Sequence, residues 1–221
     1  MTDIAGKVRR VLERIQDATK RSGRPADSVQ LLAVTKTVAP EHIREALACG
    51  ITHVAENRLQ EALTKREALA SEKLMWHFIG HLQTNKAKKV VENFDVVHSV
   101  DRLELAQALA RCVSDRPPLP VLIEVKLYEE PNKSGVSEAD LSSLVSSVRS
   151  LTALDLRGLM AIPPPVDDPE QARPFFRRLR NLSKELALPE LSMGMTHDFE
   201  VAIEEGATMV RVGAGLFGSR T

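Results

Sequence analysis

The residue with the clearest chemical potential is a lysine that follows an apolar segment. Residues 31–34 (LLAV) lead through Thr35 to Lys36. Partial burial at such a position lowers the pKa of a lysine, and the neutral amine can then attack an aldehyde. The structural alternative is a lysine whose stem packs on the protein while its ammonium group reaches solvent, a common arrangement at strand ends. The chemistry of the neighbouring residues has to decide between the two.

Small residues and a hydroxyl late in the chain could supply a phosphate site. Gly213 and Gly215 follow the apolar residues 209–212, and Ser192 lies in the preceding apolar segment. Backbone N–H groups at glycines are suited to bind phosphate, and α/β barrels often bind it after their seventh and eighth strands. An amine facing a phosphate site is what pyridoxal 5'-phosphate (PLP) requires, so this context favours the reactive interpretation of Lys36.

A second charged residue lies within an apolar segment. Arg211 is flanked by Val210 and Val212. A buried guanidinium stays protonated and therefore needs a partner. Two partners are open: a carboxylate such as Glu56 or Asp198, or the ring nitrogen of PLP. A permanent cation at the ring nitrogen keeps that nitrogen unprotonated and makes the ring a weaker electron sink.

Three other patterns lack the context that their chemistry needs. Residues 213–218 fit the dinucleotide pattern GxGxxG, but only three residues follow, so we expect no helix there to bind a pyrophosphate. His77 and His81 are four residues apart, but the predicted strand and Gly80 place them on no common helical face, and the glutamate of a zinc motif is missing. We therefore predict no metal site. The basic residues at 86, 88 and 89 are too few to indicate nucleic acid.

The composition limits the class of protein. The 221 residues include 30 basic and 30 acidic side chains, a balance that gives no indication of binding to nucleic acid or to an anionic membrane. Apolar runs are far shorter than a membrane span, and charged residues interrupt the N-terminal region where a signal peptide needs an apolar core. The two cysteines lack a metal-binding spacing. We therefore expect a cytoplasmic protein.

The elements that must position these residues alternate regularly along the chain. Residues 4–15 carry apolar side chains at helical spacing after Asp3, a candidate N-cap. Eight apolar segments indicate strands, at residues 31–34, 53–55, 76–80, 96–100, 120–126, 156–162, 190–193 and 209–212. Helical stretches separate them, and this alternation predicts parallel strands joined by crossover helices.

Eight such units predict an α/β fold, a single TIM (β/α)8 barrel with an extra N-terminal helix that covers the place of a final helix. A doubly wound open sheet is the alternative. Because no linker or low-complexity tract interrupts the chain, we expect one domain over residues 1–221. Barrel active sites lie at the C-terminal ends of the strands. The residues that the prediction places there are Thr35, Lys36, Glu56, Asn57, His77, Gly80, Met160, Ser192, Gly194, Arg211, Gly213 and Gly215.

Six motifs in order resemble those of the pyridoxal phosphate homeostasis proteins, whose fold is similar to the N-terminal barrel of alanine racemase. The motifs are LLAVTKT around Lys36, Glu56-Asn57, WHFIGHLQTNK, RGLMAI, LSMGMTHD and MVRVG. The resemblance implies a PLP Schiff base on Lys36 and a ring-nitrogen contact from Arg211. It also implies phosphate contacts near Ser192, Gly213 and Ala214, and pocket roles for Asn57, His77 and Met160.

Three positions depart from the usual family pattern. Ala55 stands in place of a glycine, and Thr196 replaces a serine while keeping a hydroxyl group. Ala214 replaces a serine or threonine, so any phosphate contact there has to come from its backbone N–H group.

The resemblance implies a protein of PLP homeostasis that binds the aldehyde reversibly and hands it to apo-enzymes, with little catalysis. We expect a monomer with a small-molecule ligand and with neither nucleic acid nor membrane as a partner. The alternative is a PLP-dependent amino-acid racemase. Two-base racemisation needs an acid–base group on each face, and Tyr128, the only tyrosine, is the candidate for the second.

Overall fold

A closed barrel of eight parallel strands forms the centre of the computed structural model, which describes residues 3–130 and 134–218. Each strand pairs with the next along the chain, and β8 pairs with β1. The strands are β1 (Gln30–Val34), β2 (His53–Glu56), β3 (Met75–Phe78), β4 (Val96–Val100), β5 (Leu119–Glu124), β6 (Leu154–Met160), β7 (Glu190–Met195) and β8 (Met209–Val212). The predicted TIM barrel is confirmed, and the open-sheet alternative is wrong.

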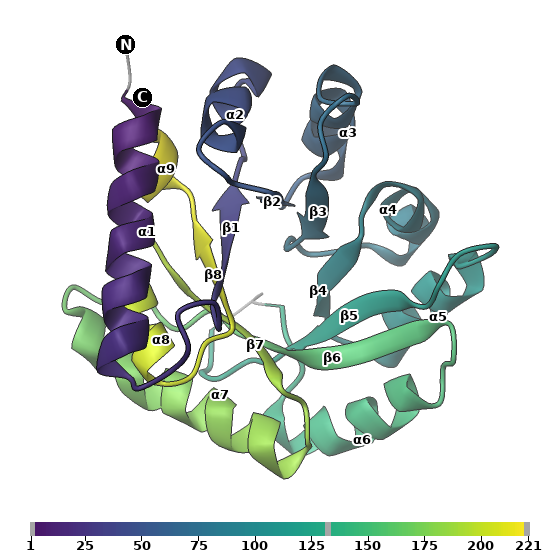
Figure 1. Ribbon diagram of the computed structural model, residues 1–221. Helices are drawn as coiled ribbons and strands as arrows, with labels where there is room; N and C mark the ends of the chain where they lie inside the picture. The colour runs from purple at the N-terminus through teal and green to yellow at the C-terminus, as the bar shows by residue number, and fades with distance from the viewer. Residues whose placement is uncertain (1–2, 131–133, 219–221) are drawn as a thin grey trace.

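Helices surround the barrel, as Figure 1 shows. They are α1 (Ile4–Arg21), α2 (Pro40–Leu47), α3 (Leu59–Ala68), α4 (Ala87–Asn93), α5 (Leu103–Cys112), α6 (Glu138–Arg149), α7 (Arg173–Glu185), α8 (Phe199–Glu204) and α9 (Ala214–Phe217). The short 3-10 turns η1 (Thr84–Lys86) and η2 (Pro169–Ala172) precede α4 and α7. In the described ranges, none of these helices is both long and apolar enough to cross a bilayer.

The N-terminal helix closes the ring of helices. Asp3 accepts a hydrogen bond from the Gly6 N–H group at 2.7 Å, so its predicted capping role is confirmed. The apolar face of α1 is buried, and α1 packs against α2, α8 and α9 (Figure 1). One detail differs from expectation, because the single-turn helix α9 follows β8. Leu216 of α9 is fully buried, and this contact with the core stabilises a turn too short to be predicted.

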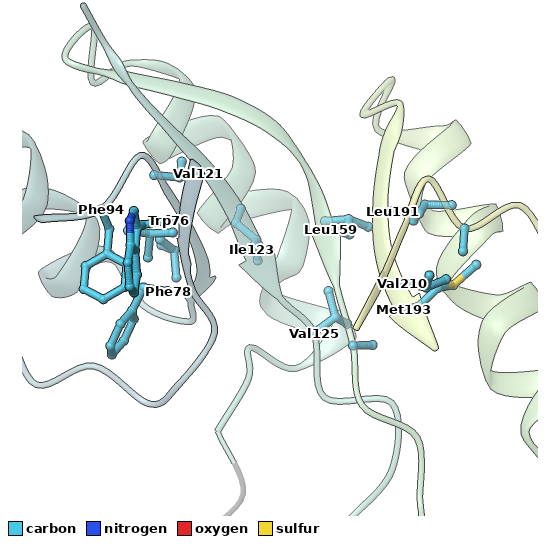
Figure 2. Packing of buried hydrophobic residues seen from close by; sticks show 14 of the residues in the cluster. Trp76, Phe78, Phe94, Val121, Ile123, Val125, Leu159, Leu191, Met193 and Val210 are labelled. Carbon is cyan, nitrogen blue, oxygen red and sulfur yellow. The ribbon is translucent and has the colours of Figure 1, made fainter. Parts of the chain in front are cut away.

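Successive side chains of each strand point alternately out of and into the barrel. On β3, Trp76 and Phe78 point outward toward the helices. Phe78 meets Phe94 edge to face with ring centroids 5.1 Å apart, and Figure 2 shows these three aromatic side chains gathered together. His77, between Trp76 and Phe78 in the sequence, points inward. The same alternation turns Arg211 inward between the outward Val210 and Val212.

The middle of the barrel is filled by a second, separate apolar cluster. Its members come from strands around the whole barrel: Leu32, Val34, Ala55, Val96, Leu122, Met160 and Met209. TIM barrels have such a packed interior rather than a pore. A ligand therefore has room only at the barrel ends, where the strands meet their loops.

Candidate functional site

Lys36 lies in a tight turn just beyond the C-terminal end of β1. The Val38 N–H group donates to the Thr35 carbonyl oxygen at 2.9 Å and closes the turn around Lys36. Thr37 has a φ of 62°, in the left-handed region that a β-branched residue rarely adopts. The Glu61 carboxylate accepts a hydrogen bond from the Thr37 N–H group and stabilises this conformation. Lys36 itself is half-buried, at the barrel end that the sequence predicts.

An ion cluster of Lys65, Glu56 and Glu61 binds the backbone of this turn at Thr35 and Thr37. The Lys65 Nζ donates to Glu56 Oε1 at 2.7 Å, to Glu61 Oε1 at 2.6 Å and to the Thr35 carbonyl oxygen at 2.5 Å. The Thr35 hydroxyl group also donates to Glu56, at 2.6 Å. Burial raises the pKa of Glu56, although the hydrogen bonds from Lys65 and Thr35 oppose this. The cluster ties α3 to the backbone beside Lys36.

Arg211 projects into the barrel from β8 and is 3% exposed. Its guanidinium donates to the Ser192 carbonyl oxygen at 2.6 Å, the Ser192 hydroxyl at 2.8 Å and the Ala161 carbonyl oxygen at 3.0 Å. Burial lowers the pKa of Arg211 to about 10, while the carboxylates of Asp198 and Glu124 act to raise it. The guanidinium therefore remains protonated at neutral pH. Neutral oxygens fix its orientation, and Asp198, one of the two carboxylates considered above, acts on it through its electric field.

Three inward-facing histidines, which we call the histidine column (His53, His77 and His98), continue from Ser192 through the barrel. His98 Nδ1 lies 2.9 Å from Ser192 Oγ, His77 Nδ1 lies 2.8 Å from His98 Nε2, and His53 Nδ1 lies 2.9 Å from His77 Nε2. Burial lowers the pKa of His77 to about 3, and it lowers the pKa of His98 well below its ordinary value. Both imidazoles are therefore neutral at physiological pH.

The column ends at a cavity of about 340 Å³ at the N-terminal end of the barrel. His53 and His77 both line this cavity, together with the first residues of several strands. The predicted pocket residue His77 thus borders the end opposite to the Lys36 turn, and its contact with PLP stays a prediction. The sequence analysis missed His53 and His98. Within the residues that the structure describes, no group of three His, Cys, Asp or Glu side chains is arranged to hold a metal ion.

Backbone N–H groups gather near Lys36 where β8 ends. Val34 of β1 lies beside Gly213, since a Cβ atom at Gly213 would lie 3.3 Å from the Val34 carbonyl oxygen. The N–H groups of Gly213 and Gly215 both point to the Thr196 hydroxyl oxygen, each at 3.4 Å. The Thr196 hydroxyl oxygen is therefore the acceptor that these two N–H groups share, although the sequence analysis did not count Thr196 among the site residues. The retained hydroxyl group was the signal.

The other predicted residues lie on the neighbouring strand ends. Asn57 follows β2 directly, and its Oδ1 is buried without a hydrogen-bond partner among the described residues. Met160 is the fully buried last residue of β6. Gly194 of β7 has a φ of 88°, and a Cβ atom there would lie 2.5 Å from the Cβ atom of Ala202, so close packing against α8 requires a glycine.

Ser192 occupies a different place from the one expected for a phosphate ligand. Its side chain is fully buried, and its hydroxyl oxygen already bonds Arg211 and His98. A contact of Ser192 with phosphate stays a prediction, whereas its hydrogen bond with Arg211 is present in the structure. A further cavity, of about 470 Å³, opens at the same barrel end between the loops after β5, β6 and β7. Tyr128 and Asp198 are among its lining residues.

Comparison with known proteins places this geometry in a family. The model of the alanine racemase N-terminal domain family matches residues 8–221. A pyridoxal phosphate homeostasis protein from Aquifex aeolicus is 49% identical over 221 residues, which cover 97% of each chain. The chain belongs to this family. A pyridoxal phosphate homeostasis protein from Pseudomonas aeruginosa is 46% identical, over 100% of this chain and 97% of that one. The predicted resemblance is confirmed.

Solved structures of similar chains have the same barrel. A protein from Bifidobacterium adolescentis superposes with a TM-score of 0.91 at 38% identity, covering 97% of this chain and 94% of that one. The family member PipY from Synechococcus elongatus, solved with PLP bound, gives a TM-score of 0.83 at 40% identity and covers 94% of this chain and 100% of PipY. Alanine racemase from Corynebacterium glutamicum, at 18% identity and a TM-score of 0.68, shares the fold alone and is covered over 61% of its length.

Proposed function

We propose that the protein binds PLP as a Schiff base on Lys36 and acts in PLP homeostasis as a carrier, with little catalysis of its own. The observation that carries the proposal is that Lys36 follows β1 directly while Arg211 lies on β8, the strand that pairs with β1. These strands bring an amine for an aldehyde and a cation for a ring nitrogen to one end of the barrel. The relative PipY, solved with PLP bound, supports the same ligand.

The residues at this barrel end suit PLP, which supplies an aldehyde that condenses with amines. The buried Asn57 Oδ1 has no partner in the described ranges, and a donor on a bound ligand would satisfy it. Glycine at position 213 keeps side-chain atoms away from Val34. The N–H groups of Gly213 and Ala214 would then bind the phosphate, the Gly213 N–H group in place of its 3.4 Å contact with the Thr196 hydroxyl oxygen.

Each residue then has a definite task. The Lys36 Nζ, in its neutral form, bonds to the aldehyde carbon while water leaves. Arg211 stays protonated and donates to the ring nitrogen, and Ser192 holds the guanidinium in place. Met160 at the end of β6 and Gly194 on β7 would line the site, whereas a contact of His77 with PLP stays a prediction, because His77 borders the cavity at the opposite barrel end. Because Arg211 does not release a proton, the ring nitrogen stays unprotonated and the ring withdraws electrons weakly.

The alternative function, an amino-acid racemase, needs a second acid–base group opposite Lys36. Tyr128 is the candidate, because it lines the cavity beside the site. Its hydroxyl group donates to the Glu130 carboxylate at 2.6 Å. This bond stabilises the protonated phenol and opposes its use as a base. We therefore favour the carrier over the racemase.

The proposal extends to the setting in which the protein works. We infer a single domain over residues 1–221 that is monomeric and cytoplasmic and delivers PLP to apo-enzymes. It has neither nucleic acid nor membrane as a partner, in line with the balance of 30 basic and 30 acidic residues. Light scattering tests the monomer, and transfer of PLP from the loaded protein to an apo-enzyme tests delivery. A dimer, or transfer no faster than from buffer, would contradict these two parts.

Borohydride reduction of the PLP-loaded protein tests the Schiff base on Lys36. We expect the reduced chromophore on the peptide that contains Lys36, and we expect Lys36→Ala to lose it. Lys89→Ala is the matched control, because Lys89 lies exposed on α4, away from the site. A label on another lysine of the wild-type protein, or none at saturating PLP, contradicts the assignment.

A further inference from the structure

The hydrogen bonds around Ser192 have a single consistent direction. A guanidinium has donors and no acceptors, so Arg211 donates to the Ser192 oxygen. The hydroxyl hydrogen of Ser192 then needs its own acceptor in a fully buried position. His98 Nδ1, at 2.9 Å, supplies it. The opposite direction, with His98 donating, would leave the Ser192 hydrogen without an acceptor among the described residues, which is unfavourable in a buried site.

This direction propagates along the histidine column. Each neutral imidazole carries one N–H group and one acceptor nitrogen. Once His98 Nδ1 accepts, its proton lies on Nε2, which faces His77 Nδ1. His77 then carries its proton on Nε2 and donates to His53 Nδ1. All three histidines are thereby in the Nε2–H form, and the last N–H group belongs to His53 at the cavity at the N-terminal end.

We propose that His98 is a positioning residue for Arg211: by accepting the Ser192 hydroxyl hydrogen, it keeps a lone pair of Ser192 turned toward the guanidinium. The guanidinium is thereby held in the orientation that reaches the PLP ring nitrogen. This inference rests on the proposed function. His77 supports His98 in turn by accepting its Nε2–H group, and His53 supports His77 in the same way.

The nature of the column favours this role over simple filling of space. A cluster of seven apolar side chains fills much of the barrel interior, and such side chains have no hydrogen-bond requirement. His98 instead lies with both ring nitrogens engaged and no exposed surface. Among the groups that bind the Arg211 guanidinium, His98 contacts the Ser192 hydroxyl group. Removal of the acceptor nitrogen is therefore the informative change.

The first test uses the protein without PLP, so it does not depend on the proposed function. Two-bond ¹⁵N–¹H correlation spectra of ¹⁵N-histidine-labelled protein distinguish Nε2–H from Nδ1–H imidazoles. We expect Nε2–H signals for His53, His77 and His98 at neutral pH. An Nδ1–H form of His98 would overturn the proposal. If the Nε2–H signals are found but the wild-type protein does not bind PLP, the proposed function fails and the hydrogen-bond direction still stands.

The second test compares His98→Phe with His98→Asn in the PLP-loaded protein. Phenylalanine removes the acceptor, whereas the asparagine Oδ1 can replace Nδ1 and restore it. We expect His98→Phe to shift the absorption maximum of bound PLP and to weaken PLP affinity about tenfold. His98→Asn should retain the wild-type spectrum, as should His42→Phe, a control at an exposed position of α2.

These outcomes decide the proposal. A wild-type spectrum and affinity in His98→Phe overturn it, and so does an equal shift in both variants of His98, because the acceptor would then be irrelevant. If His98→Phe does not fold, His98→Asn decides together with the NMR spectra. In His98→Asn, a wild-type absorption spectrum of bound PLP together with Nε2–H forms of His53 and His77 supports the proposal. A shifted absorption spectrum in that variant overturns it.

Discussion

Replacement of Lys65 by methionine tests whether the buried ion cluster holds the Lys36 turn. The variant keeps an unbranched side chain but removes the ammonium group from Glu56, whose side chain is fully buried. Breaking a buried ion pair from one side destabilises a protein by about 3–5 kcal/mol. In a chain of this length each kcal/mol lowers the Tm by about 2–4 °C, so we expect a decrease on the order of 6–20 °C. The Lys36 turn should also loosen, and PLP retention should fall.

The loss of stability depends on pH with a sign set by Glu56. Burial raises the pKa of Glu56 in the folded protein, and loss of Lys65 raises it further. A carboxyl group whose folded pKa exceeds its unfolded value stabilises the fold below the unfolded pKa, and this contribution is lost as the pH rises through the folded pKa. We therefore expect Lys65→Met to be least stable at alkaline pH and to recover toward acid pH.

Urea and thermal unfolding monitored by circular dichroism, at acid and alkaline pH, measure both effects. Lys88→Met is the control, because the Lys88–Glu92 pair at 3.9 Å is 78% and 53% exposed, and such pairs contribute at most about 1 kcal/mol. The double variant Lys65→Met, Glu56→Gln should recover stability at alkaline pH, since it no longer buries a charge. Equal stability of the Lys65 and Lys88 variants, or a loss independent of pH, would refute the reasoning.

Three further predictions concern the ligand. Arg211→Gln should shift the PLP absorption spectrum and weaken binding, whereas Arg111→Gln, at an exposed position of α5, should leave both unchanged; a spectrum that Arg211→Gln does not move contradicts the ring-nitrogen contact. Pyridoxal should bind far more weakly than PLP by titration, and equal affinity for the two compounds rules out a phosphate site. Ser192→Ala, which removes a hydrogen-bond acceptor of Arg211, should lose about 1–3 kcal/mol of PLP binding. Chiral chromatography should find racemisation of alanine, serine or glutamate near that of free PLP, and turnover on the order of 1 s⁻¹ that Tyr128→Phe abolishes would reverse the carrier assignment.

The barrel was predictable because each strand is a short apolar segment between helices with apolar faces. Closure followed from the number of units, and the reactive turn from the position of Lys36 after such a segment. The identity of the Arg211 partners was not predictable. Two backbone carbonyl oxygens accept hydrogen bonds from the guanidinium. Every residue carries such an oxygen, so no pattern of side chains predicts which ones are used.

The histidine column and the ion cluster escaped prediction for a related reason. His53, His77 and His98 lie on three successive strands, and their contact depends on the register and tilt of the closed barrel rather than on spacing in the sequence. Lys65 looks like an ordinary surface residue of a charged helix, and only the packing of α3 over β2 buries it. The one-turn helix α9 was missed because four residues carry too little helical pattern.

The pairing of β1 with β8 has a consequence for how the protein matures. Lys36 is synthesised well before Arg211 and Gly213, so β1 and β8 can pair and close the seam between them only after β8 has been made. Contacts between such distant parts of a chain form slowly during folding. A nascent chain therefore carries Lys36 before Arg211 and Gly213 exist, and the proposed site is complete only when β1 and β8 have paired. A ligand that touches both sides of the seam would act as a clasp, since it binds the closed barrel and not the open one.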